Sequence, residues 1–388
     1  MLLQIRAVSS VGLRSLFRSG LATAIVVASL AGVTLAVMTL LALSQGYAQS
    51  MQPASGERRA VILSAGATSE ARSAIARGEA DRLLLERPGL IEAAQAEVSI
   101  TVEASAAGHA FKAVLRGLDG FRGVPIGVNM EAGALPRSGR RELIVGSTLA
   151  RREPLVKVGE AIEIDSARWT VVGIFSADIP SQESEIIGHG AMINAELGQP
   201  PVHQLVRVAL APGVTPEMLD ARLSEETRTD YELIAEQDYY ARAAAGFSSF
   251  LHVLAYPLAA ITGFAISMSI LNLCLTMLAR RRKELATLYT MGFGRGVIVI
   301  AEIVQAATLG LAGGIAAAAA AAILLDGHEV STTLGNASGA ASFFRMEFSL
   351  SIYVVGLAYG LLLGALSGSV PAIRSMSTVS LESLREAT

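Results

Sequence analysis

The sequence predicts a membrane protein in which four transmembrane α-helices carry one large α+β domain outside the membrane, inserted between the first and second helices. Three observations predict this. The 388 residues have a mean hydropathy of +0.49 and only 17% of them are charged, whereas about a quarter of the residues of soluble domains are charged. Four apolar stretches reach the roughly 20 residues that a bilayer-spanning helix needs. Between the first two, residues 44–246 mix strand and helix patterns and can bury a core of their own.

The four predicted transmembrane helices are stretches of apolar residues with almost no charge. They are residues 21–43, 257–279, 297–325 and 350–373. Glu302 is the one charged residue within them. The first stretch also has features of a cleavable signal peptide, but it is longer than the 7–15-residue apolar core of such peptides, so we expect it to remain as an anchor.

The orientation of the helices follows from their basic flanks, because Arg and Lys beside a span resist translocation. If the spans alternate, the flanking basic residues fall on one side: Arg6, Arg14, Arg18, Arg280, Arg281, Arg282, Lys283, Arg295, Arg374 and Arg385. We therefore expect both termini to be cytoplasmic, as an amphipathic segment at residues 1–20 and a tail at 374–388. The short loop at 326–349 is then outside, together with the large domain.

The outside domain is predicted from alternating and helical patterns in the sequence. Strands are expected at residues 59–64 and 205–211, and hairpins at 96–103 with 111–115 and at 161–165 with 169–175. Helices are expected at 69–86 and, behind Thr215 as a cap, at 215–227. Residues 180–201 have no clear pattern and are expected to be irregular. The domain is α+β, with one lobe or two.

Residues 237–250 have helical spacing and run almost directly into the second span. We therefore expect a stalk continuous with this transmembrane helix, residues 247–279, with a kink at Pro257. A continuous helix would connect the outside domain mechanically to the membrane. The alternative is a loop at the membrane surface.

Small residues recur at every fourth position inside the spans, where they would let helices approach closely. In the fourth span the repeat consists of Gly356, Gly360, Gly364 and Gly368. Each glycine costs about 1 kcal/mol of helix propensity relative to alanine, so chance alone explains them poorly. For similar ladders in the other spans, an interface and chance are equally good explanations. We expect a tightly packed bundle that a second copy or a paralogous subunit completes.

The loop between the second and third spans, residues 280–296, continues from four basic residues into a short amphipathic helix. Leu285, Leu288 and Tyr289 share one helical face, and Gly292-Phe293-Gly294 ends the helix. Such a helix either lies on the bilayer or docks into a cytoplasmic partner.

The stretch RRRKELATLYTMGFGRGVIVIAEIVQAATLGLAGG resembles the membrane core of FtsX-like ABC permeases, the MacB and LolC/LolE group. Glu284, Leu285, Ala286, Gly292 and Glu302 stand at the matching positions. RRELIVGSTLARREPLVKVGEAIEIDSARWTVVGIF is similar to the MacB-type periplasmic domain, and the tail PAIRSMSTVSLESLREAT is similar to the end of the family's chains.

The resemblance implies a stand-alone permease in the bacterial inner membrane that exports or extracts an amphipathic or lipid-like substrate by mechanotransmission. Its partners would be a cytoplasmic ABC ATPase subunit, a second permease copy or paralogue and membrane lipid; a periplasmic adaptor protein is left open. The residues implied in contact with the ATPase are Arg282, Lys283, Glu284, Leu285, Leu288, Tyr289 and Gly292.

The sequence lacks the motifs of an enzyme. Lys112, Lys157 and Lys283 are its only lysines and none follows a glycine, so the chain has no P-loop and ATP must bind to a partner subunit. No metal site, cofactor or catalytic residue is predicted, and a net charge of −3 gives no reason to expect a nucleic-acid partner. The lone Cys274 excludes an intrachain disulfide. Glu302 is either a proton or substrate site or a structural residue that pairs with Arg295 or caps a neighbour.

Two other functions stay open at this point. One is a transmembrane regulator like FtsX, which activates a cell-wall enzyme and transports nothing. The other is a membrane receptor without an ATPase, which would leave the amphipathic loop unexplained.

Overall fold

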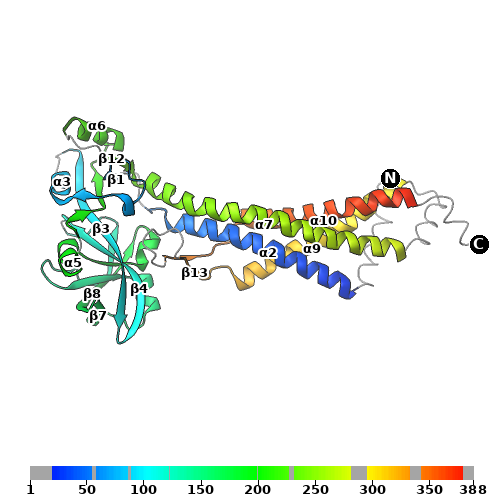
Figure 1. The fold of residues 1–388 in the computed structure, drawn as a ribbon, viewed down its shortest axis with the longest axis horizontal. Helices are drawn as coiled ribbons and strands as arrows, with labels where there is room; N and C mark the ends of the chain where they lie inside the picture. The colour runs from blue at the N-terminus through cyan, green and yellow to red at the C-terminus, as the bar shows by residue number, and fades with distance from the viewer. Residues whose placement is uncertain are drawn as a thin grey trace, which may run out of the picture. The chain divides into compact units, whose positions relative to one another are not determined.

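The computed structural model describes residues 20–54, 58–85, 89–121, 123–198, 200–226, 231–280, 295–332 and 342–378 (Figure 1). They divide into two compact units. The helical unit consists of Met1–Gln45, Ser249–His328 and Met346–Thr388, and the α+β unit of Gly46–Ser248 and Glu329–Arg345.

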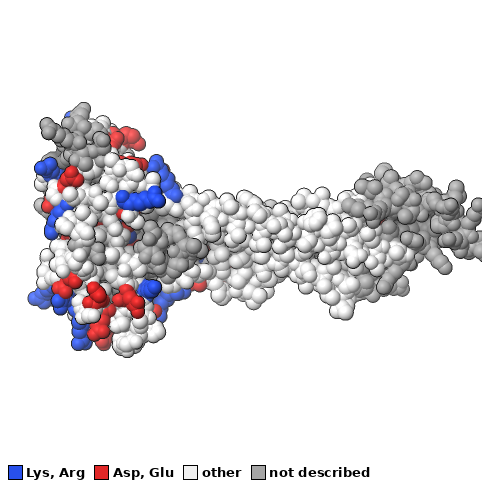
Figure 2. Space-filling view, in the orientation of Figure 1, with Lys and Arg blue, Asp and Glu red and all other residues white. Residues whose placement is uncertain are grey.

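Within the described residues, four helices are long and apolar enough to cross a membrane: α2 (Gly20–Ser50), α7 (Glu236–Arg280), α9 (Arg295–Leu324) and α10 (Leu350–Thr378). Large apolar side chains such as Ile25, Ile261 and Leu362 are more than half exposed on them. In Figure 2 the described surface of these helices shows neither acidic nor basic side chains on the face in view. Such a surface suits lipid rather than water.

The α7 helix begins earlier than the predicted stalk and is 45 residues long. Glu236 and Asp238 lie in its first turn, where carboxylates interact favourably with the helix dipole. The helix also continues through Pro257. The alternative of a surface loop before the second span is therefore wrong.

The α+β unit is built on a mixed ten-stranded sheet with the order β12-β1-β11-β3-β4-β9-β6-β8-β5, to which β7 adds by pairing with β3 and β8. The pairs β4–β9 and β6–β8 are parallel. The strands are β1 (Arg59–Ser64), β3 (Ile91–Ala106), β4 (His109–Asp119), β5 (Val128–Gly133), β6 (Glu142–Gly146), β7 (Ala161–Ile164), β8 (Ala167–Ala177), β9 (Ile186–His189), β11 (Leu205–Leu210) and β12 (Tyr231–Ala235).

Short elements complete the α+β unit. They are η1 (Glu70–Arg72), β2 (Ile75–Ala76), α3 (Arg77–Leu83), α4 (Ser147–Arg152), η2 (Pro180–Ser184), α5 (Gly190–Glu196), β10 (Val202–His203) and α6 (Pro216–Glu226). The segment between α9 and α10 contributes a further hairpin, β13 (Glu329–Thr332) with β14 (Ser342–Arg345).

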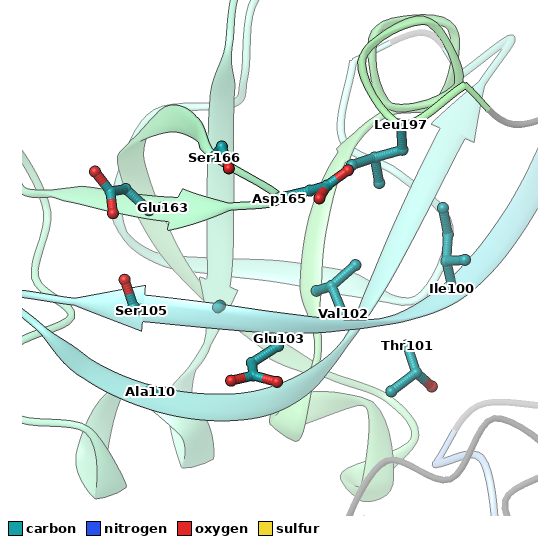
Figure 3. A pocket seen from close by; sticks show the side chains of 11 residues that line it. Ile100, Thr101, Val102, Glu103, Ser105, Ala110, Glu163, Asp165, Ser166 and Leu197 are labelled. Carbon is teal, nitrogen blue, oxygen red and sulfur yellow. The ribbon is translucent and has the colours of Figure 1, made fainter.

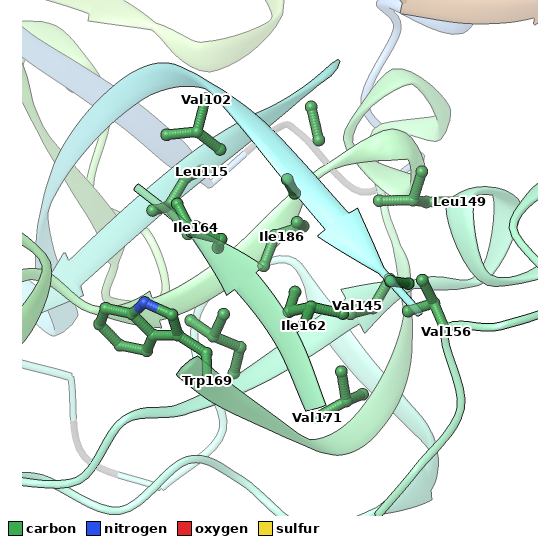
Figure 4. Packing of buried hydrophobic residues seen from close by; sticks show 14 of the residues in the cluster. Val102, Leu115, Val145, Leu149, Val156, Ile162, Ile164, Trp169, Val171 and Ile186 are labelled. Carbon is green, nitrogen blue, oxygen red and sulfur yellow. The ribbon is translucent and has the colours of Figure 1, made fainter. Parts of the chain in front are cut away.

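Two large hydrophobic clusters form the core of this unit. The first surrounds the fully buried Trp169 and includes Leu115, Val145 and Ile186 (Figure 4). The second packs the faces of β1 and β11 against α3 and α6, through side chains such as Ile62, Leu83, Val206, Val208, Leu219 and Leu223. The long strand β3 contributes to both clusters, so two lobes share one sheet.

Both predicted hairpins are confirmed. β3 and β4 pair on either side of Ala107-Gly108, and β7 and β8 on either side of Asp165-Ser166. All four turn residues have positive φ, as two-residue hairpin turns require.

Two expectations for this unit are wrong. Residues 69–86 do not form one helix, because Ile75–Ala76 pairs with Val202–His203 and the hydroxyls of Ser64 and Ser73 bind backbone N–H groups across the segment. Residues 180–201 are not irregular, because Ile186–His189 is a strand between β4 and β6. In both cases distant residues supply the pairing, which local patterns do not report.

Candidate functional site

The most deeply buried charges of the α+β unit lie where α7 begins. Arg207 on β11 donates from Nε to Glu97 on β3 at 2.7 Å and from Nη1 to Glu236 at 2.7 Å. Its Nη2 donates to the hydroxyl of Tyr240 at 3.1 Å. Arg207 and Glu97 are 1% exposed and Glu236 is fully buried. The first turn of α7 is therefore bonded to the middle of the sheet.

A second arginine extends the network. Arg116 on β4 donates to Glu97 at 2.8 Å, to Glu185 at 2.6 Å and to Glu70 at 3.3 Å. Glu97 thus bridges the two arginines. We call Glu70, Glu97, Arg116, Glu185, Arg207 and Glu236 the charge network.

Burial and charge act against each other in this network. Burial by itself would raise the pKa of Glu97, but the charges of Arg207 and Arg116 lower that pKa below its ordinary value. At Glu185 burial prevails and the pKa is raised, although Arg116 opposes the shift. Despite burial, the carboxylates hold the pKa values of Arg116 and Arg207 well above the ordinary value. Removing one partner of such a buried pair costs about 3–5 kcal/mol because the other charge is left uncompensated.

Two tyrosines and a glutamine bind the same turns of α7 to other parts of the unit. The hydroxyl of Tyr239 accepts a hydrogen bond from the backbone N–H of Glu70 at 3.1 Å. The hydroxyl of Tyr240 also accepts one from Nε2 of Gln182 in η2 at 3.1 Å. The N-terminal end of α7 is thereby fixed from several directions.

The β13–β14 hairpin is held by a different kind of contact. The guanidinium of Arg152 on α4 lies 3.8 Å from the ring centroid of Phe343, and its Nε is 3.4 Å from a carboxylate oxygen of Glu329. The ring of Phe344 lies 5.7 Å from that of Tyr47, which in turn lies 4.3 Å from the ring of Phe247. A partly exposed ion pair and a cation–π contact each contribute about 0.5–1 kcal/mol.

In the helical unit, glycines let α9 and α10 touch backbone to backbone. A Cβ added at Gly360 would lie 2.6 Å from the carbonyl oxygen of Gly310, and one at Gly364 would clash with the carbonyl oxygen of Ala306. Gly368 also faces Ala306, whereas Gly356 packs against Met38 of α2. Three of the four predicted packing glycines therefore lie against α9 and the fourth against α2.

The other predicted site residues are less well defined. Glu302 is buried in α9 at 8% exposure, next to the buried Gln305. The side chain of Arg295, its expected partner, lies outside the described residues. The same is true of all seven residues expected to contact an ATPase, which belong to the undescribed segment 281–294.

The described residues line several cavities, and the linings of two of them bear on ligand binding. One, of about 490 Å³, lies beside β3 and the β7–β8 turn and is surrounded by Glu103, Glu163 and Asp165 (Figure 3). Acidic residues of this kind also occur on solvated strand ends, so they identify no ligand. The other is an apolar groove of about 400 Å³ between α7 and α10, lined by side chains that include Phe264 and Tyr359. Within the described residues, no group of three or more His, Cys, Asp or Glu side chains could hold a metal ion.

These features define a multi-pass membrane protein with an α+β domain inserted between its first two membrane helices. A family model described as the MacB-like periplasmic core domain matches residues 23–226, which is more than half of the chain. The chain belongs to this family and is an ABC transporter permease of the MacB and FtsX type. The resemblance inferred from the sequence is confirmed, as is the predicted fold class.

Solved structures similar to the chain include the periplasmic region of MacB from Actinobacillus actinomycetemcomitans, which is 11% identical. The match covers 48% of this chain and 92% of that one, with a TM-score of 0.38. The extracellular domain of the noncanonic ABC-type transporter YknZ from Gram-positive bacteria is 15% identical, with coverages of 45% and 99% and a TM-score of 0.36. No curated protein sequence matches the chain.

The sequence reasoning missed the charge network and Arg152. One signal was available, because Arg207 stands in the middle of the otherwise apolar strand LVRVAL. A charge at such a position needs a buried partner. The identity of that partner could not be read from the sequence.

Proposed function

We propose that the chain is the membrane subunit of a mechanotransmission ABC transporter in the bacterial inner membrane. A separate cytoplasmic ATPase binds and hydrolyses ATP, and the permease converts this into movement of the α+β unit on the periplasmic side. Both termini are cytoplasmic. The substrate is amphipathic or lipid-like and is exported or extracted from the membrane.

The observation that carries this proposal is the continuity of α7. Its first residue, Glu236, takes part in the charge network, and its last, Arg280, directly precedes the loop with the expected ATPase contacts. A 45-residue helix is about 68 Å long at 1.5 Å per residue. A continuous helix with its first turn fixed in the sheet can transmit displacement along its length.

Two further features support the proposal. The close contact of α9 with α10 favours a bundle that moves as one body, which a second permease copy or a paralogue completes. The groove between α7 and α10 is lined mainly by apolar side chains, and the hydroxyl of Tyr359 in its wall already donates to the backbone oxygen of Ala259 at 2.7 Å. The groove therefore favours an apolar ligand such as an acyl chain.

The test is affinity purification of the tagged protein from native membranes in mild detergent. We expect an ABC ATPase at about one to one. The double variant Glu284→Arg with Leu288→Asp should lose this ATPase while still inserting into the membrane. A matched control, Thr287→Arg with Thr290→Asp, changes the opposite face of the same predicted helix and should retain the ATPase. Retention by both double variants would contradict the proposal.

A deletion strain separates transport from the regulatory alternative. Loss of transport changes sensitivity to amphipathic compounds, whereas loss of a regulator of a cell-wall enzyme changes cell shape and chaining. Altered shape and chaining without altered sensitivity would favour the FtsX-like alternative.

A further inference from the structure

The β13–β14 hairpin and α7 are attached to the α+β unit in physically different ways. The carboxylate of Glu236 in α7 is fully buried and ion-paired. The corresponding ion pair of the hairpin, Arg152 with Glu329, has side chains that are 34% and 33% exposed. Once separated, the side chains of Arg152 and Glu329 can be hydrated, whereas the buried carboxylate of Glu236 cannot. The free-energy cost of breaking the ion pair at the hairpin is therefore far lower.

The hairpin is placed so that its opening would matter. In the chain its two strands lie in the connection between α9 and α10. Its contact residue Arg152 ends α4, and Ser147 at the other end of α4 is hydrogen-bonded to Glu183 of η2 at 3.0 Å. The neighbouring Gln182 donates to Tyr240 of α7. A displacement of the hairpin therefore reaches α7 through α4 and η2.

The packing beneath the hairpin is close and apolar. Gly46 on α2 lies against the backbone oxygen of Arg345, so only a residue without a side chain permits this contact. Phe344, 4% exposed, covers Tyr47, and no ion pair joins these aromatic rings. The aromatic contact is apolar and can be made and broken without stranding a buried charge.

From these contrasts we infer that the β13–β14 hairpin is a releasable latch on the α+β unit. Arg152 closes it by stacking on Phe343 and pairing with Glu329, and movement of α9 and α10 during the transport cycle opens it. The opening step rests on the proposed function, whereas the closed contact of Arg152 does not. The buried attachment of α7 would persist through the cycle, whereas the exposed attachment of the hairpin would be made and broken.

The latch is tested with thiol labelling in the full-length protein in lipid nanodiscs. Cys274, the only cysteine, is replaced by alanine, and Phe344→Cys introduces a thiol that is buried while the latch is closed. The rate of maleimide labelling then follows the open fraction. Arg152→Ala should raise this rate by roughly fivefold to thirtyfold, the ratio that corresponds to one or two kcal/mol. Arg152→Lys, which keeps the charge but not the planar stacking group, should give an intermediate rate.

Arg151→Ala is the matched control, because the adjacent Arg151 belongs to the same helix but pairs with Glu183 and not with the hairpin. It should leave the rate unchanged. The half-buried Val330 gives a second labelling position, as Val330→Cys, that leaves Phe344 in place. Labelling there should also be slowest in the parent and fastest in Arg152→Ala, which excludes an effect of losing Phe344. Equal rates for Arg152→Ala and its parent at both positions would overturn the latch.

The release is tested in the complex with the partner ATPase. Labelling should differ at least severalfold between the nucleotide-free and the vanadate-trapped complex. If the complex hydrolyses ATP but is labelled at the same rate in both states, the hairpin does not open during the cycle and the inference is overturned. If no ATPase associates, the proposed function fails, whereas the Arg152 variants still decide whether the latch exists.

Discussion

Nη1 of Arg207 donates to a carboxylate oxygen of Glu236 at 2.7 Å in the interior of the α+β unit. Arg207 lies in the middle of the sheet, and Glu236 is the first residue of α7. Neither side chain is more than 1% exposed. This ion pair connects the long helix to the sheet by a bond that water does not weaken, and its removal leaves a charge in a place where it cannot be solvated.

Arg207→Ala should therefore lower the free energy of unfolding of the α+β unit by about 3–5 kcal/mol. The fluorescence of Trp169, the only tryptophan and fully buried in this unit, reports the urea midpoint directly. Arg242→Ala is the control, because Arg242 pairs with Glu232 at the surface and its loss should cost at most about 1 kcal/mol. Similar midpoints for the two variants would show that the network contributes no more than a surface pair.

The stability of the unit should fall in mild acid. The pKa of Glu97 is lower in the folded protein than its ordinary value, so its contribution is present above about pH 4.3 and is lost as the pH falls further toward the folded pKa. The pKa of Glu185 is raised in the folded protein, so its contribution to stability falls as the pH rises through that pKa. Urea midpoints between about pH 4.5 and pH 3 should decrease for the parent and less steeply for Glu97→Gln. An unchanged slope in the variant would assign the acid sensitivity to other carboxylates.

Gly360→Ala should weaken the contact of α9 with α10, although alanine is the better helix former. The added methyl group would meet the backbone oxygen of Gly310 at 2.6 Å, so the two helices must separate. Gly32→Ala is the matched control, since no atom lies within 4 Å of its added Cβ and the change should be neutral or stabilising by up to about 1 kcal/mol. Thermal unfolding of both variants in the same detergent compares them. A Gly360→Ala protein as stable as Gly32→Ala would contradict close packing.

Ala107→Gly should stabilise the β3–β4 hairpin. Ala107 has φ of 48°, a left-handed conformation that costs an L-residue roughly 1 kcal/mol and glycine nothing. A higher urea midpoint by Trp169 fluorescence is expected. Ala110→Gly, in the adjoining strand, should instead lower the midpoint, because glycine weakens a strand interior. If both changes lower it, strain at Ala107 is not the dominant effect.

Much of the architecture is local in origin and could be predicted. Apolar stretches of sufficient length become membrane helices wherever they lie, because an unpaired backbone cannot enter lipid. The Ala107-Gly108 hairpin follows from alternation around a turn that tolerates positive φ. The family motifs are likewise continuous in sequence. For these features a window of about 20 residues contains the whole cause.

The sequence by itself thus determined four membrane helices in order, an α+β domain after the first of them, and the class of permease. Only the tertiary structure decided that Ile75–Ala76 is a strand, that Ile186–His189 enters the sheet, and that Arg207 joins Glu97 and Glu236. The first of these partners is 110 residues away along the chain. Such pairings depend on which buried charges and strand edges come together when the core closes, and no local pattern records that choice.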